Sequence, residues 1–173
     1  MGWNTSALFV RGRSIDEVEA SLPDVVDYVP TEEQVSADHA WSQSPGQRLY
    51  LAETDGWCQL WDPDQRLPPN VDRWLTLDAL GALKGTQALA VLLSSVMSTY
   101  ALWLYDDCEL VRHVSFVNGE PTTEIGASLQ VESGIDVPSW GPDEDFVWAV
   151  IKDVTGLSSD MDQLFAVYEL DEF

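Results

Sequence analysis

Basic residues are scarce in this sequence. Lysine and arginine together number 8, against 30 aspartate and glutamate residues, which gives a formal net charge of -22 at pH 7. A surface with this charge repels phosphate backbones and anionic lipid head groups. We therefore expect no binding to nucleic acid or to a membrane surface, and we expect any charged partner to be a basic protein.

Cysteine and histidine, the residues of most zinc and redox sites, number two each. Cys58 and Cys108 lack the CxxC spacing of such sites, and both thiols are expected to be reduced in a cytosolic protein. The sequence also lacks the GxSxG, P-loop and GxGxxG motifs of hydrolases, nucleotide hydrolases and dinucleotide-binding proteins. No cofactor is expected.

Long apolar runs are missing as well. The longest candidate, Ala88–Met97, is interrupted by Ser94 and Ser95, whereas a membrane-spanning helix needs about 20 apolar residues. The first residues carry no basic segment ahead of an apolar one, which argues against a signal peptide. We expect a cytoplasmic protein.

The sequence does contain enough apolar residues for a core. Hydrophobic residues make up 45% of the chain and include eight tryptophans, whereas disordered chains lack such residues. A length of 173 residues suits one core of ordinary size. We expect a single domain over residues 1–173.

Several segments carry local signals for helices. Ser14 and Glu17 have the spacing of a capping box, which predicts a helix from Ser14. Thr31 and Gln34 have the same spacing and predict a second helix to about Trp41. Two further helices are predicted over residues 76–83 and 143–156.

Asp55-Gly56 and Asn118-Gly119 predict tight turns between strands, the first within a hairpin over residues 48–62. The tail from 162 is either a last strand or a docked extension. Mostly short antiparallel connections predict an α+β fold, an antiparallel sheet built from a meander and hairpins, with helices packed mainly on one face. The other predicted strands span residues 3–11, 88–96, 99–105 and 109–117.

The connection between two of these strands concentrates potential ligands. Asp106, Asp107 and Glu109 surround Cys108, and His113 follows on the next strand. These side chains are of the types that bind zinc or serve a small carboxylate- and histidine-dependent hydrolase. A metal site needs three or four ligands that converge, and a solvated hairpin turn explains the same residues without a metal. Both interpretations stay open.

The stretch "LWLYDDCELVRHVSF" followed by "IGASLQVESG" resembles a bacterial family of small acidic proteins of unknown function. The resemblance implies a β-hairpin and no known activity, and Cys108 stands where the family pattern has glycine. The family carries a Trp, an Asp-Gly turn, Leu-Val-Arg, a strand Ser and a GxxL segment, which correspond here to Trp103, Asp107, Leu110, Val111, Arg112, Ser115, Gly126 and Leu129.

Trp57 and Trp61 offer another kind of site. They are four residues apart in a predicted strand, so both face the same side, with Gln59 between them. Two exposed rings at this spacing form a platform on which sugars or bases can stack. Core packing would instead bury both rings.

The charge distribution favours a non-catalytic protein-protein interaction module. From Asn118 to Phe173 the chain has 13 acidic residues and a single basic one, Lys152. Such a surface suits fast capture of a basic partner, as in an immunity-like inhibitor that masks a cationic toxin. The alternatives are a small hydrolase that uses carboxylates and His113, and a ligand-binding module around Trp57 and Trp61.

Overall fold

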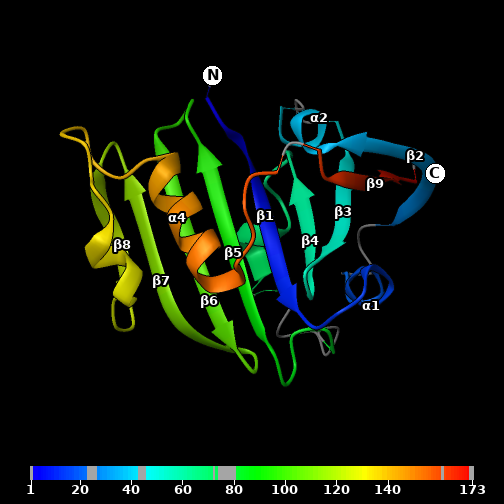
Figure 1. The fold of residues 1–173 in the computed structure, drawn as a ribbon, viewed down its shortest axis with the longest axis horizontal. Helices are drawn as coiled ribbons and strands as arrows, with labels where there is room; N and C mark the ends of the chain where they lie inside the picture. The colour runs from blue at the N-terminus through cyan, green and yellow to red at the C-terminus, as the bar shows by residue number, and fades with distance from the viewer. Residues whose placement is uncertain are drawn as a thin grey trace.

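The computed structural model describes residues 2–22, 27–42, 46–71, 73, 81–160 and 162–171. Within them, nine strands form one antiparallel sheet of order β2-β9-β3-β4-β1-β5-β6-β7-β8 (Figure 1). The strands are β1 (Asn4–Arg11), β2 (Tyr28–Ser36), β3 (Arg48–Thr54), β4 (Trp57–Asp62), β5 (Gln87–Ser94), β6 (Thr99–Asp106), β7 (Glu109–Val117), β8 (Glu120–Ile125) and β9 (Leu164–Leu170). The helices are α1 (Ile15–Glu19), α2 (Ala37–Ser42), α4 (Glu144–Thr155) and the short 3-10 helices η1 (Pro68–Asn70) and η2 (Gln130–Gly134).

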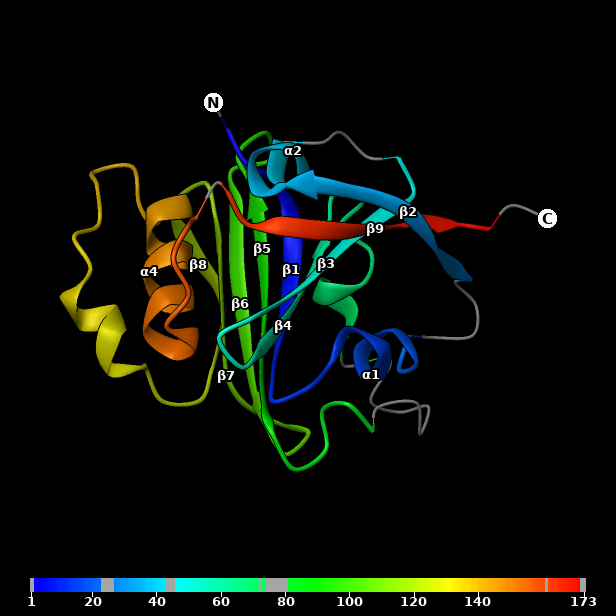
Figure 2. The same cartoon turned by 45° about the vertical axis from the view of Figure 1, so that its right-hand side comes forward.

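Both faces of the sheet carry buried apolar side chains. Alternation along β1 sends Ala7 and Phe9 into one cluster and Leu8 and Val10 into the other. Helices α2 and α4 contribute to the first cluster, and α1 and the chain around η1 contribute to the second. In Figure 2, where β1, β5 and β6 are seen nearly edge-on, α4 and α1 lie on opposite sides of the sheet.

The predicted meander is confirmed. Strands β5, β6 and β7 pair in sequence order, and β6 is an interior strand with apolar residues on both faces. Tyr100 and Leu102 join the cluster under α4, whereas Trp103 and Tyr105 pack on the opposite face. The hairpin of β3 and β4 is also confirmed, with Asp55 at φ 49° and Gly56 at φ 83° in its turn.

Helix α4 confirms the helix predicted over residues 143–156. The Asp143 carboxylate accepts the Asp145 N–H at 3.1 Å, and Gly156 ends the helix in the left-handed region at φ 73°. Val147, Val150 and Ile151 are buried on the face toward the sheet. The capping interaction of Ser14, which accepts the Glu17 N–H at 3.1 Å, is confirmed in the same way at α1.

The helix predicted over residues 31–41 is wrong for most of its length. Residues 28–36 form the edge strand β2, and helix α2 begins only at Ala37. The reason is a partner distant in sequence: β9 pairs with β2, and the Thr31 hydroxyl donates to the Val167 carbonyl at 2.9 Å rather than capping a helix. The tail is therefore a strand. The helix predicted over residues 76–83 lies mostly outside the described residues.

The two edge strands carry residues that discourage pairing with another sheet. Pro121 and Glu124 lie on the exposed strand β8, and Pro30 and Glu32 lie on β2, which also has an irregularity in its register. Proline cannot donate a ladder hydrogen bond, and glutamate is costly to bury. Binding of a partner by addition of a strand at either edge is therefore disfavoured.

Candidate interaction surface at one end of the sheet

The acidic segment between β6 and β7 is a hairpin turn. Asp107 and Cys108 occupy the left-handed region, with φ of 48° and 66°, and Asp106 and Asp107 are exposed. The Asp107 carboxylate accepts the Gly85 N–H at 2.6 Å, which ties the turn to the segment before β5. Cys108 thus adopts the conformation that glycine usually supplies in such a turn.

His113 does not converge with this turn. Its ring stacks on Trp103 with centroids 4.7 Å apart, and its Nδ1 lies 2.8 Å from the Leu102 carbonyl oxygen. The register pairs Trp103 with His113 and Asp106 with Glu109, so about 10 Å of strand separates the two pairs. Among the residues that the structure describes, no group of three or more His, Cys, Asp or Glu could hold a metal ion.

Of the two alternatives for Trp57 and Trp61, core packing is the one that the structure shows, and the exposed platform is excluded. They do face the same side of β4, but Trp57 is 6% exposed and Trp61 is fully buried. Trp61 packs against Trp41 and Trp148 at centroid distances of 5.4 and 5.8 Å. Strand β4 lies in the interior of the sheet, so its residues on this face meet α2 and α4 rather than solvent.

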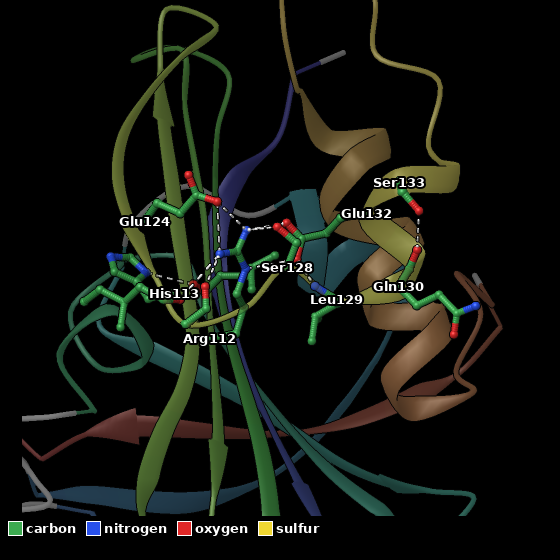
Figure 3. Close-up of polar contacts among 11 residues, drawn as sticks. Arg112, His113, Glu124, Ser128, Leu129, Gln130, Glu132 and Ser133 are labelled. Carbon is green, nitrogen blue, oxygen red and sulfur yellow. Dashed lines mark hydrogen bonds and ion pairs between the residues drawn. The ribbon is translucent and has the colours of Figure 1, made fainter.

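Arg112 is a buried cation whose hydrogen-bonding capacity is used within the chain (Figure 3). It donates to both carboxylate oxygens of Glu132 at 2.6 and 3.0 Å, to Glu124 at 3.2 Å and to the Gly126 carbonyl at 3.0 Å. The hydrogen bond to Glu132 is the main cause that raises the pKa of Arg112 above its usual value. These contacts fasten the segment after β8 to β7, so we assign Arg112 a structural role.

Several other arginines are also paired with carboxylates. Arg13 lies 3.6 Å from Glu17, Arg66 lies 3.0 Å from Asp64, and Arg48 pairs with Glu169. These pairs neutralise much of the small cationic charge locally, whereas the chain has 30 acidic residues in all. The surplus carboxylates therefore dominate the field around the molecule.

Three large apolar side chains are exposed at the end of the sheet where β5 and β7 finish and α4 begins, the upper end in Figure 1. Val96 and Met97, in the turn between β5 and β6, are 81% and 67% exposed, and Trp140, before α4, is 69% exposed. The Asn118 N–H donates to the Ser98 carbonyl at 2.9 Å, which brings the two adjacent turns together. Exposed apolar side chains that gather in this way mark a binding surface more often than isolated ones do.

A cavity of about 440 Å³ opens beside Trp140 and reaches Ser98 in the turn between β5 and β6. The Tyr100 hydroxyl donates to Glu144 at 3.0 Å, and the Trp140 indole N–H donates to Asp143 at 3.2 Å. Burial is the first cause that raises the pKa of Tyr100, and the hydrogen bond to Glu144 adds to it. The cavity is lined by Ser98, Tyr100, Asn118, Gly119, Trp140, Pro142, Asp143 and Glu144.

Two glycines hold the loop that carries Trp140 against the turn between β7 and β8. Gly119 and Gly141 have φ of 79° and 99°, a region that residues with side chains rarely adopt. A Cβ atom on Gly119 would collide with the Trp140 carbonyl, and one on Gly141 would collide with the Gly119 backbone. The position of Trp140 is thus fixed by backbone packing.

Sequence reasoning missed this surface. The predicted helix begins at residue 143 and the predicted strand over 88–96 ends at Val96, so neither prediction marks Trp140 or Val96 as part of a surface. One feature of the sequence could have indicated the exposure of Trp140. It follows Pro138 and Ser139 in a segment whose apolar residues have neither helical nor strand periodicity, so the pattern predicts no core position for it.

Comparison with models of known protein families, with curated proteins and with solved structures finds no match to this chain. Within the described ranges, no helix has both the length and the apolar character needed to cross a membrane.

Proposed function

We propose that this protein is a non-catalytic interaction module that captures a basic protein at the end of the sheet. The observation that carries the proposal is the exposure of Trp140 beside the carboxylates Asp143 and Glu144. Val96 and Met97 are exposed in the turn between β5 and β6, which contributes Ser98 to the same cavity. Binding energy at protein interfaces is concentrated in a few apolar and aromatic side chains, and tryptophan is prominent among them. Charges around such a centre select the partner and speed the encounter.

The net charge of -22 supports a basic partner over a nucleic acid or a membrane surface. Capture and masking of a cationic protein in the cytoplasm, as an immunity-like inhibitor does, is the form of the proposal that fits this charge. The resemblance to small acidic bacterial proteins belongs to the same proposal. We also propose that the helices cover mainly one face of the sheet, because α2 and α4 contribute to the same cluster. Helix α4 in addition supplies Glu144 to the proposed surface.

The test begins with affinity purification from the native cell and identification of the bound protein by mass spectrometry. Affinity is then measured with the two purified proteins. We expect the affinity to fall about tenfold or more between 50 and 500 mM salt, because salt screens the attraction between exposed charges. An affinity that stays flat over this range contradicts the proposal.

The surface itself is tested with a Met97→Ser, Trp140→Ala double variant, which should weaken binding at least tenfold at constant salt. Ile125→Ala is the matched control, since Ile125 is also an exposed apolar side chain but lies at the far end of β8. Equal effects of the double variant and the control would show that the partner binds elsewhere.

A further inference from the structure

We infer that the cavity beside Trp140 receives an arginine side chain of the basic partner. The inference rests on the proposed function and adds the chemistry of the contact. The cavity of about 440 Å³ combines two aromatic residues, Tyr100 and Trp140, with two carboxylates, Asp143 and Glu144. Among the described residues that line it, none is cationic.

This combination suits a guanidinium group better than an ammonium group. Guanidinium is planar, so it can stack on an aromatic ring while its edge donates hydrogen bonds to carboxylates. It carries five N–H donors in a fixed plane, which allows it to bridge two acceptors at once. A lysine ammonium group is a compact, strongly hydrated charge and gains less from a flat ring.

The two carboxylates retain acceptor capacity for such a ligand. Glu144 accepts from the Tyr100 hydroxyl through Oε2, and Asp143 accepts the Asp145 N–H through Oδ1 and the Trp140 indole N–H through Oδ2. Each carboxylate oxygen can accept about two hydrogen bonds. The contacts within the chain therefore orient both groups and leave room for further donors.

The cavity is also formed before any ligand arrives. The close approach of Gly119 and Gly141 fixes the Trp140 backbone, and the hydrogen bond between Tyr100 and Glu144 joins β6 to the first turn of α4. A site built in advance loses less conformational entropy when it binds. On binding, it is then mainly the arginine side chain of the partner that loses conformational freedom.

The probe for the test is the peptide acetyl-Gly-Arg-Gly-amide, titrated into the full chain at constant ionic strength and followed by 15N NMR. The signals to watch are the Trp140 indole N–H, assigned with Trp140→Phe, and the Gly119 backbone N–H. Two matched peptides replace arginine with citrulline, which is uncharged and of similar shape, or with lysine. We expect saturable shifts with arginine, none with citrulline, and binding of lysine that is several-fold weaker.

The carboxylate is tested with Glu144→Gln, which keeps an acceptor for the Tyr100 hydroxyl but removes the charge. We expect it to weaken binding of the arginine peptide about three- to tenfold. Asp153→Asn is the matched control, because Asp153 is an exposed carboxylate on the same helix and does not line the cavity. It should leave the affinity within about twofold.

Equal binding of the citrulline or lysine peptide, or no effect of Glu144→Gln, overturns the inference. The two proposals fail separately. If the arginine peptide does not bind here while the Met97→Ser, Trp140→Ala variant still loses the partner, the interaction surface stands and the arginine pocket falls. If that variant keeps its partner, the proposed function falls as well.

Discussion

Arg112 and Glu132 form a two-point ion pair, with contacts of 2.6 and 3.0 Å, although Arg112 is only 1% exposed. Strand β7 is thereby joined to η2, at the end of the segment that follows β8. Replacing Arg112 with methionine keeps the apolar volume but leaves the Glu132 carboxylate, whose side chain is only 10% exposed, without its counter-charge. We expect Arg112→Met to lower the free energy of unfolding by about 3–5 kcal/mol, measured by urea denaturation.

Arg48→Met is the matched control for this prediction. Arg48 also pairs with two carboxylates, Glu169 and Glu33, but its side chain is substantially exposed. Exposed pairs contribute about 0–1 kcal/mol, because water and salt screen them. Similar losses for the two variants would contradict the structural role of Arg112.

The approach of Gly119 to Gly141 predicts that alanine is poorly tolerated at either position. In Gly141→Ala the new Cβ would meet the Gly119 backbone, and the φ of 99° would itself be strained. We expect a loss of about 1–3 kcal/mol in the free energy of unfolding and a shifted Trp140 indole signal in NMR. Gly134→Ala, where a Cβ meets open space, should change neither quantity.

Much of the fold was predictable because its signals are local. The Asp55-Gly56 turn, the Asn118-Gly119 turn and the helix predicted over residues 143–156 each depend on a few neighbouring residues, and all three form as predicted. Alternation along 99–105 also predicted the two-sided burial of β6, since side chains in a strand take opposite faces.

The predicted secondary structure is wrong where pairing with a segment distant in the sequence determines the structure. Thr31 resembles a helix cap in sequence, yet it bonds to Val167, a residue 136 positions away, within an edge pairing of β2 and β9. No window of neighbouring residues contains that information. The capping spacing predicts a helix only when no strand is available to pair with the same residues.

The candidate site also depends on residues that are far apart in the sequence. The Asp106–His113 stretch was a candidate in the sequence because its polar residues are adjacent in the chain, with a solvated turn as the alternative. The surface at the end of the sheet instead joins Tyr100 to Glu144, which are 44 residues apart. Its main signal is the exposure of Trp140, which depends on the folded packing of the loop and not on composition.

The two cysteines should differ sharply in reactivity. Cys58 is fully buried, and its burial raises the pKa of the thiol to about 12. Cys108 lies half-buried in a turn, and burial followed by the Asp107 charge raises its pKa. Because the thiolate is the reactive form, we expect one slow thiol per native chain toward Ellman's reagent at pH 8 and two in denaturant. Cys108→Ser should abolish the native reaction, and a persisting reaction would show that Cys58 is accessible.

Alkaline pH should destabilise the fold through Tyr28 and Cys58. Burial is the largest cause that raises the pKa of each to about 12, against about 10 for tyrosine and 8.5 for cysteine in an unfolded chain. Between these values the unfolded chain releases protons that the folded chain keeps, so the free energy of unfolding falls as pH rises. The stabilising contribution is complete below about pH 8.5 and is lost as pH rises through about 12.

The measurement is urea denaturation of the wild type and of Tyr28→Phe at half-unit steps from pH 8 to 11.5. Tyr28→Phe removes the titrating hydroxyl and the hydrogen bond that Arg66 donates to it at 2.7 Å. The free energy of unfolding of the variant therefore differs from that of the wild type already at pH 8, where Tyr28 is not ionised. What should differ is the slope: above pH 10 the variant loses stability less steeply than the wild type, because one fewer buried group must ionise. Parallel slopes for the two proteins would mean that Tyr28 titrates alike in the folded and unfolded chains, and its burial beside Asp62 and Arg66 would then carry no pH dependence.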